Sequence, residues 1–158
     1  MDPAIRQLLD EQAIIDVCIR YATAIDDRDW ERLRSCFLPD AVGIYHADRV
    51  LTGYPAIEEV LRTAVTPMSR TQHLVTNVTV VLAGDEATSQ CYLHAQHVRA
   101  GLPGGEKFVV AGRYRDRFVR TDDGWRIRER RLDRWWTAGN PAVVARPSGS
   151  VPPVAPTG

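Results

Sequence analysis

The 158-residue sequence lacks most features that mark a specialised class of protein. Its formal net charge is zero, with 20 basic and 20 acidic residues, so charge gives no reason to expect a nucleic-acid or membrane partner. No apolar run approaches the length of a membrane span. The amphipathic, acidic start MDPAIRQLLDEQ does not have the pattern of a signal peptide. We therefore expect a cytoplasmic protein.

Cysteine and lysine are both scarce. Cys18, Cys36 and Cys91 are odd in number and widely spaced, with no CxxC pair. This favours a reducing compartment and argues against a disulfide framework or a zinc site. Lys107 is the only lysine, and we interpret the preference for arginine as genome composition.

Apolar residues make up 44% of the chain and charged residues 25%, which is typical of a soluble globular domain. The chain is organised around the segment Tyr21–Phe37, where a long apolar helix meets a cluster of carboxylates. We predict that this helix begins at Asp2-Pro3 and ends at Asp26–Asp29, and that a second helix runs from Trp30 to about Phe37. A carboxylate in this position is either a plain helix cap or a pocket residue.

Downstream of Pro67 the hydrophobic period changes from helical to strand-like. Helices followed by hairpin-connected strands predict an α+β fold, with the helices on one face of the sheet. A curved antiparallel or mixed sheet wrapped around the N-terminal helices would leave a cone. The interior of such a cone can hold a pocket. The predicted elements are strands Ala41–Tyr45 and Arg49–Thr52 around His46–Asp48, helix Ala56–Ala64, and strands His73–Leu82, Ala87–Arg99, Phe108–Arg120 and Trp125–Trp136.

We assign residues 1–137 to one domain and 138–158 to a Pro/Ala/Val-rich tail. The tail either folds over the mouth of the pocket as a lid or has no fixed structure.

Side chains alternate between the two faces of a strand, so each predicted strand assigns its residues to a face. In Ala87–Arg99, His97 lies on the apolar face and His94 on the opposite one, which argues against a metal site built from these two residues. In Phe108–Arg120, Tyr114 and Asp116 lie on the inward face. A buried carboxylate needs a partner, so Asp116 is either an ion-pair partner of Arg128 or Arg130 or a site residue.

Four polar residues form a candidate acid–base set: Asp26, Tyr45, His73 and His97. Each has an ordinary explanation when taken alone, as a cap, a packing residue, a strand-end histidine or a satisfied core histidine. One carboxylate, two histidines and a tyrosine that converge on a single cavity would instead support proton-transfer chemistry.

The segments YATAIDDRDWERLR, SRTQHLVTN and HAQHV resemble the SnoaL-like branch of the nuclear transport factor 2-like superfamily, and within it scytalone dehydratase. The similarity covers about residues 5–136. It implies a cone-shaped α+β barrel with a deep, mostly apolar pocket. It also implies that Asp26 orients His73, that His97 is the second catalytic histidine and that Tyr45 is the catalytic tyrosine.

The residues implied to hold the substrate differ from those of the dehydratase. Where the dehydratase has a second tyrosine before its aspartate, this chain has Ile25. Tyr114 and Asp116 occupy about the region of its polar third-strand residues. The expected substrate-binding residues are Tyr21, Ile25, Tyr114, Asp116 and Trp136.

The resemblance implies a lyase without metal or organic cofactor, a dehydratase that acts through an enolate on a small apolar ketone, polyketide-like or cyclic. An isomerase or a cyclase would begin with the same enolate, and a non-catalytic ligand-binding protein or accessory subunit would share the fold. We also expect a homo-oligomer, a dimer or a trimer, because Tyr92 and other partly apolar residues lie on the outer face of the sheet.

Overall fold

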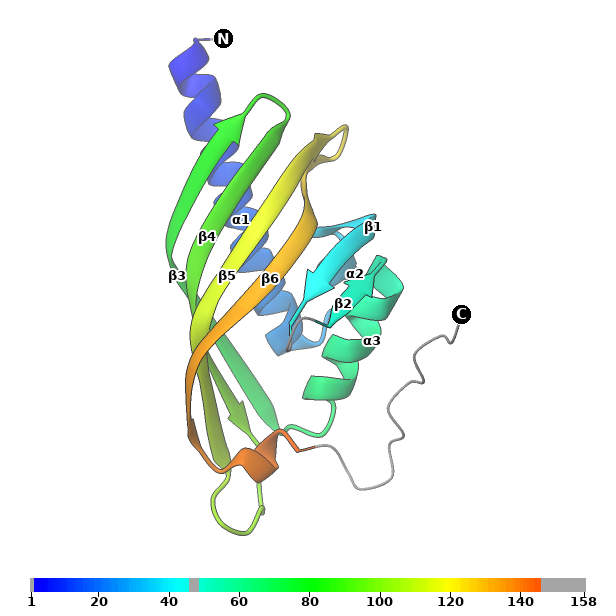
Figure 1. The fold of residues 1–158 in the computed structure, drawn as a ribbon, viewed down its shortest axis with the longest axis vertical. Coiled ribbons are helices and arrows are strands. Elements are labelled where there is room, and N and C mark those ends of the chain that lie inside the picture. Colours follow the sequence, from blue (N-terminus) through cyan, green and yellow to red (C-terminus); the bar gives the residue numbers. More distant parts are fainter. Residues whose placement is uncertain (1, 46–48, 146–158) are drawn as a thin grey trace.

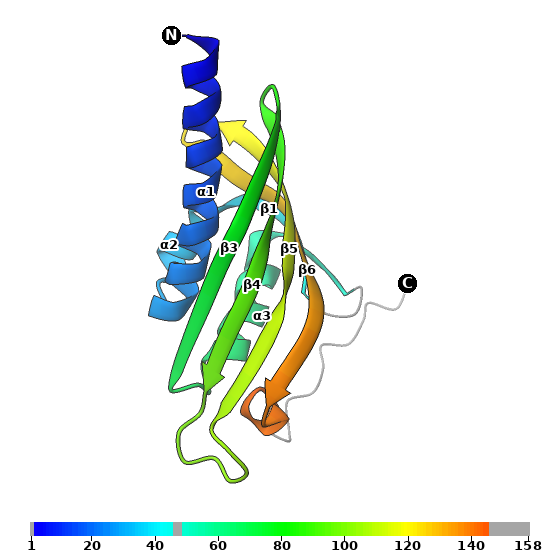
Figure 2. The ribbon, with the colours of Figure 1, turned by 90° about the vertical axis from the view of Figure 1, so that its left-hand side faces the viewer.

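The computed structural model describes residues 2–45 and 49–145. The strands form a single six-stranded sheet. Figures 1 and 2 show that the sheet bends around the helices, which lie on its inner side. The strand order is β2-β1-β6-β5-β4-β3, with β1 parallel to β6 and every other pair antiparallel. The elements are α1 (Pro3–Asp27), α2 (Trp30–Arg34), β1 (Phe37–Ile44), β2 (Val50–Thr52), α3 (Tyr54–Val65), β3 (Arg70–Ala83), β4 (Glu86–Val98), β5 (Lys107–Thr121), β6 (Gly124–Gly139) and a short 3₁₀ helix, η1 (Pro141–Val143).

Helix α1 begins and ends as its sequence predicts. The Asp2 side chain accepts a hydrogen bond from the backbone N–H of Ala4, and Pro3 occupies the first helical position. Arg28 ends the helix in the left-handed conformation, with φ of 57°. The buried stripe of the helix packs against the inner face of the sheet and carries Ile14, Val17, Cys18, Tyr21, Ala22 and Ile25. No helix in the described part of the chain is long and apolar enough to cross a membrane.

The predicted second helix is too long. It ends at Arg34, and Phe37 begins strand β1 instead of closing the helix. Phe37 is buried and pairs with Ile127 of β6, so tertiary contacts outweigh the local helical pattern. Leu38-Pro39-Asp40 lies inside β1, where the register with β6 is irregular between Phe37 and Val42. Proline has no N–H for the ladder, which is consistent with this break.

The four long strands lie within a few residues of their predicted bounds. Strand β6 continues to Gly139, past residue 137, and η1 then buries Val143 against Phe108 and Val110. The end of β6 and η1 therefore pack on the domain, at one end of the molecule (Figure 1). The predicted connection His46–Asp48 and the tail from residue 146 lie outside the described residues.

Strand β6 contains one extra residue near its end, a β-bulge at Trp135. Trp136 pairs with Ala111 and Arg134 pairs with the next residue of β5, Gly112. The backbone passes very close here, since a Cβ atom on Gly112 would lie 2.2 Å from the carbonyl oxygen of Asp133. The bulge interrupts the alternation of faces on β6.

Because of this bulge, the prediction that Trp136 lines the pocket is wrong. Trp135 and Trp136 both lie on the outer face of the sheet, where they are 50% and 52% exposed. Their rings contact Tyr92 and His94, at centroid distances of 5.1 and 5.9 Å. Strict alternation from Leu132 and Arg134 would have turned Trp136 inward.

Candidate active site

A cavity of about 1090 Å³ lies between α3, the inner face of the long strands and the segment after β6. Most of its wall is apolar, with contributions from Leu61, Val65, Leu93 and Phe108. The polar groups that line it include His73, His97, Tyr21, Tyr45 and Tyr114. Three of the four predicted acid–base residues thus line one apolar cavity, and the fourth, Asp26, contacts His73.

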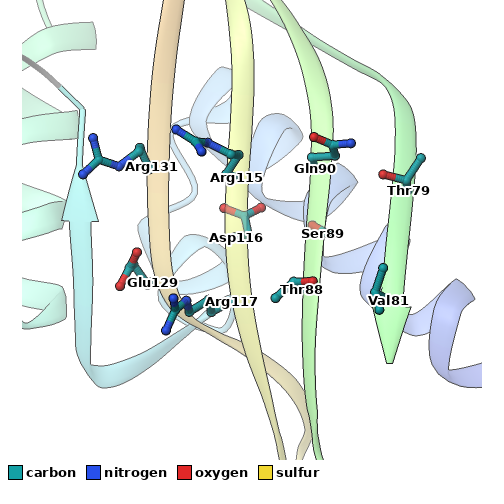
Figure 3. Close-up of a pocket in the computed structure, with 10 residues that line it drawn as sticks. All are labelled: Thr79, Val81, Thr88, Ser89, Gln90, Arg115, Asp116, Arg117, Glu129 and Arg131. Carbon is teal, nitrogen blue, oxygen red and sulfur yellow. The ribbon is translucent and has the colours of Figure 1, made fainter. Parts of the chain in front are cut away.

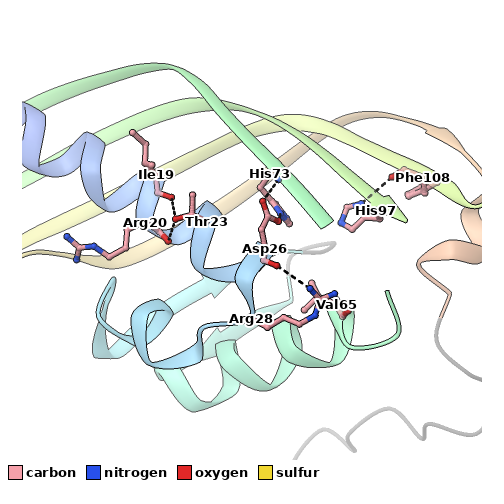
Figure 4. Close-up of polar contacts among 9 residues, drawn as sticks. All are labelled: Ile19, Arg20, Thr23, Asp26, Arg28, Val65, His73, His97 and Phe108. Carbon is pink, nitrogen blue, oxygen red and sulfur yellow. Dashed lines mark hydrogen bonds and ion pairs between the residues drawn. The ribbon is translucent and has the colours of Figure 1, made fainter. Parts of the chain in front are cut away.

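Two hydrogen bonds join Asp26 and His73 where α1 meets β3 (Figure 4). The His73 ring Nδ1 lies 2.7 Å from Asp26 Oδ1. The backbone N–H of His73 donates to the other carboxylate oxygen, Oδ2, at 2.8 Å. Both the ring and the backbone of His73 are therefore held by one carboxylate, although the two residues are 47 positions apart in the sequence.

Arg28 holds the end of α1 that carries Asp26. Its guanidinium donates to the backbone carbonyl oxygens of Asp26, Val65 and Met68, at 3.2, 3.2 and 2.8 Å. These bonds tie the end of α1 to the end of α3 and the turn after it (Figure 4). The sequence interpretation treated this residue only as part of the acid cluster and missed its positioning role.

The pair fixes the tautomer of His73. Burial opposes the ionisation of Asp26, but the hydrogen bonds from the ring and backbone of His73 outweigh it and lower the pKa of the carboxyl group. An ionised carboxylate only accepts hydrogen bonds, so Nδ1 of His73 carries the proton. Nε2 of the neutral ring then has a free lone pair, and the His73 side chain is only 8% exposed.

His97 presents a second imidazole to the same cavity. The rings of His73 and His97 lie edge to face, with centroids 5.7 Å apart. Nδ1 of His97 donates to the backbone oxygen of Phe108 at 3.3 Å, since a carbonyl oxygen can only accept. Burial, reinforced by the neighbouring His73, lowers the pKa of His97 to about 4. His97 is thus neutral at pH 7, with an unprotonated Nε2.

Tyr45 lies at the end of β1 and contacts Tyr21 of α1. The Tyr21 hydroxyl donates to the Tyr45 hydroxyl at 3.4 Å. Burial raises the pKa of Tyr45 well above its ordinary value, so its hydroxyl keeps its proton and can donate it to a ligand. Gly43 makes room for the ring, because a Cβ atom there would lie 2.8 Å from Tyr45 Cε2.

The predicted substrate-binding residues separate into two groups. Tyr21, Ile25 and Tyr114 line the cavity, whereas Trp136 and Asp116 do not. Ile25 stands where the resemblance would place a second tyrosine. Tyr21 lies one helical turn before Ile25 on the same face of α1, and its hydroxyl lies beside that of Tyr45.

Asp116 is the partner of Arg130, one of the two arginines considered for it. Nε and Nη2 of Arg130 donate to the two carboxylate oxygens at 2.8 and 2.6 Å, and both side chains are fully buried. The guanidinium also lies over the rings of Tyr21 and Tyr114, at 3.9 and 4.3 Å from their centroids. The pair therefore supports two cavity-lining tyrosines from behind.

A second, shallower hollow of about 360 Å³ lies on the outer face of the sheet (Figure 3). Arg115, Arg117 and Glu129 are among the residues around it. It is separated by the sheet from the two histidines, which face the inner cavity. We therefore place the candidate active site in the inner cavity.

The alternation of faces on β4 is as predicted. His94 contacts Trp136 on the outer face, and His97 faces the cavity. Within residues 2–45 and 49–145, no group of three or more His, Cys, Asp or Glu side chains is arranged to hold a metal ion.

The sequence left open whether the segment after residue 137 covers the pocket, and Val143 and Val144 of this segment line the cavity. Sequence reasoning missed one other part of the wall. Arg134 also lines the cavity. Its position could have been found, because it alternates with Leu132 and Arg130 on one face of β6.

Comparisons with known proteins agree with this architecture. The sequence profile of the SnoaL-like domain matches residues 6–131. Rv2910c, an uncharacterized protein of Mycobacterium tuberculosis, is 33% identical over 126 residues, covering 78% of this chain and 84% of that protein. The crystal structure of Kfla4162 from Kribbella flavida matches with a TM-score of 0.80 at 25% identity, covering 87% of this chain and 98% of that one.

A protein of Novosphingobium aromaticivorans assigned provisionally as a scytalone dehydratase matches with a TM-score of 0.78 at 23% identity, covering 92% of this chain and 97% of that one. Scytalone dehydratase is thus one of several distant structural neighbours, and this likeness shows the fold alone. The predicted nuclear transport factor 2-like, cystatin-like fold is confirmed. The matched profile covers most of the described domain, and the chain therefore belongs to the SnoaL-like family.

Proposed function

We propose that this protein is a cofactor-independent acid–base enzyme, a dehydratase that removes a proton next to a carbonyl group and expels water through an enolate. The observation that carries the proposal is the 2.7 Å contact between Asp26 and His73 Nδ1, which leaves Nε2 of a buried imidazole free beside an apolar cavity. A positioned base of this kind contributes typically about 10²–10⁴-fold to the rate of proton transfer.

His73 is the general base. Its Nε2 takes the proton from the carbon next to the substrate carbonyl, and the ring becomes an imidazolium. The carboxylate of Asp26, 2.7 Å from Nδ1, stabilises this positive charge and keeps the ring oriented.

Tyr45 stabilises the enolate. Its hydroxyl receives a hydrogen bond from Tyr21 and so has its own proton available for the carbonyl oxygen of the substrate. As negative charge develops on that oxygen, the donated hydrogen bond becomes stronger, which lowers the barrier to proton removal.

His97 holds the leaving group. Because its Nε2 is unprotonated, it accepts a hydrogen bond from the hydroxyl on the neighbouring carbon. The imidazolium of His73, whose ring centroid lies 5.7 Å from that of His97, then returns its proton to the departing oxygen. The C–H and C–O bonds break, a C=C bond forms and water leaves, without an external acid.

An isomerase is the second candidate. His97 has no proton to offer at pH 7, because its pKa lies at about 4. A reaction that expels no leaving group needs no such proton, since His73 would return its proton to a different carbon of the enolate. A cyclase would begin in the same way. The dehydratase is the first choice because its leaving group gives a role to His97, which an isomerase would leave without one.

Hydrogen–deuterium exchange tests the proton-transfer step without knowledge of the substrate. We expect the wild type to accelerate exchange of the α-protons of 2-tetralone in D₂O, followed by NMR. His73→Gln should lower the enzyme-dependent rate by about 10²–10⁴-fold. Asp26→Asn should do the same, because its amide N–H would face Nδ1 and move the ring proton to Nε2.

His94→Gln is the matched control, since His94 lies on β4 but faces the outer side of the sheet. It should exchange at the wild-type rate. Formation of cyclohexenone from 3-hydroxycyclohexanone, measured by ultraviolet absorbance, then separates dehydration from isomerisation. A wild-type protein that exchanges protons no faster than buffer, or an active His73→Gln variant, would contradict the proposal.

A further inference from the structure

The charged side chains on the cavity wall are of one sign. Among the described residues that line the cavity, Arg49, Arg62 and Arg134 are charged, and none is Asp or Glu. The nearby carboxylate of Asp26 is engaged by His73 through both of its oxygens. An apolar cavity with guanidinium groups and no free carboxylate attracts an anionic ligand.

Arg134 differs from three of the arginines that precede it on β6. Arg126, Arg128 and Arg130 each have a carboxylate partner, at 3.9, 3.0 and 2.6 Å. Arg134 makes no hydrogen bond or ion pair with any residue in the described ranges. Its sequence neighbour Asp133 is bound to Arg115 instead, at 2.7 Å.

The bulge at Trp135 explains how Arg134 comes to line the cavity. Arg134 pairs with Gly112 of β5, which in turn pairs with Leu93 of β4, another cavity residue. Gly112, opposite Arg134, has no side chain. Arg134 is exposed at the cavity wall and has no hydrogen-bond or ion-pair partner among the described residues.

The other two arginines are less suited to hold a ligand. Arg62 forms an ion pair with Glu58 and lies over the ring of Trp30, with its Cζ atom 4.3 Å from the centroid. Arg49 comes directly before β2 and borders residues outside the described part. Arg134 is the cavity-lining arginine that lies on a long strand and has no hydrogen-bond or ion-pair partner within residues 2–45 and 49–145.

We propose that the substrate carries a carboxylate, which Arg134 binds at the β6 wall while the reacting carbon lies beside His73. This deepens the proposed function, because it takes the same cavity as the substrate site. The substrate class is then a mostly apolar keto acid, with its ring or chain against Leu93, Val110 and Leu132. A guanidinium donates two parallel hydrogen bonds to a carboxylate, which gives orientation as well as affinity.

Binding of the carboxylate also changes the surroundings of His97. The groups that act on this ring are His73, Asp26 and the Phe108 carbonyl, together with Arg134, whose charge disfavours protonation of His97. A carboxylate on Arg134 offsets that charge. His97 should therefore titrate at a higher pH in the complex than in the free protein.

Two matched probes test the proposal by calorimetry: 2-naphthylacetate and its neutral isostere 2-naphthylacetamide. We expect the wild type to bind the acid at least about tenfold more tightly, the scale of a charge-assisted hydrogen bond. Arg134→Gln should remove this preference without changing the affinity for the amide, and Arg134→Lys should keep part of it. Arg117→Gln, an exposed arginine beside the outer hollow, is the control and should behave as the wild type.

A second readout locates the bound acid. The NMR titration of the His97 ring should move to higher pH with 2-naphthylacetate and stay unchanged with the amide. Equal affinities of the two probes for the wild type, no measurable binding of the acid, or an unchanged preference in Arg134→Gln would each overturn the proposal. These measurements report binding and are independent of the exchange assay. A protein that binds the acid but does not accelerate proton exchange would refute the proposed catalytic function and leave the carboxylate site supported.

Discussion

Asp26 uses both carboxylate oxygens on one residue, His73, and this is more than a helix cap requires. One oxygen holds the backbone N–H at 2.8 Å and the other holds Nδ1 of the ring at 2.7 Å. The cap interpretation and the pocket interpretation of this carboxylate both remained open in the sequence. The contact with His73 supports the pocket interpretation, because a simple cap would bond to nearby backbone groups of its own helix.

At the same scale, His97 should make stability depend on pH. Its pKa is lowered from 6.5 to about 4, so between these pH values the unfolded chain binds a proton that the folded protein does not. Stability therefore rises with pH across this window and falls as pH is lowered from 6.5 towards 4. The expected loss is up to about 3 kcal/mol.

Urea unfolding at pH 4.5 and pH 7 measures this effect. His97→Gln should show a smaller difference between the two conditions than the wild type. His94→Gln, on the opposite face of the same strand, should keep the wild-type difference. An unchanged difference in His97→Gln would show that another group causes the acid sensitivity.

At the scale of elements, the buried pair of Asp116 and Arg130 joins β5 to β6. Asp116→Ala leaves a fully buried guanidinium without its partner, so we expect a loss of about 3–5 kcal/mol in the free energy of unfolding. The double variant Asp116→Leu/Arg130→Met removes both charges and should recover most of this loss. Urea unfolding compares the two, and a mild effect of Asp116→Ala on stability would contradict the structural role.

The alternation of side chains between strand faces was the most informative sequence argument. It placed His94 and His97 on opposite faces of β4 correctly because that strand is regular in its pairing with β5. It could not have placed Trp136, because one extra residue in β6 reverses the alternation there. The end of α2 was also misjudged, since the pairing of Phe37 with β6 is a contact across 90 positions that no local pattern encodes.

At the scale of the whole molecule, the expected homo-oligomer remains a prediction, and the outer face suggests where the copies meet. Four large apolar side chains are each about half exposed there: Leu74 and the aromatic residues Tyr92, Trp135 and Trp136. Arg115 and Arg117 border the hollow on the same face. A two-fold related copy would place these side chains against the other copy's arginines, and guanidinium groups bind favourably to aromatic faces.

Sedimentation velocity at micromolar concentration tests this arrangement. We expect a dimer for the wild type and a monomer for Trp135→Glu/Trp136→Glu. Leu8→Glu, at an exposed apolar position of α1, should remain a dimer. A monomeric wild type would contradict the prediction.

The hydrogen bond between Asp26 and the backbone N–H of His73 also affects what happens when Asp26 is lost in evolution. Strand β3 is the last strand of its sheet, and the N–H of His73 points away from β4 to meet Asp26. An unpaired backbone N–H on an edge strand can form a hydrogen bond with a strand of another molecule, which promotes aggregation. A homologue that loses Asp26 together with its catalytic activity would also leave the backbone N–H of His73 without a partner. Loss of catalysis and a greater tendency to aggregate would then occur together.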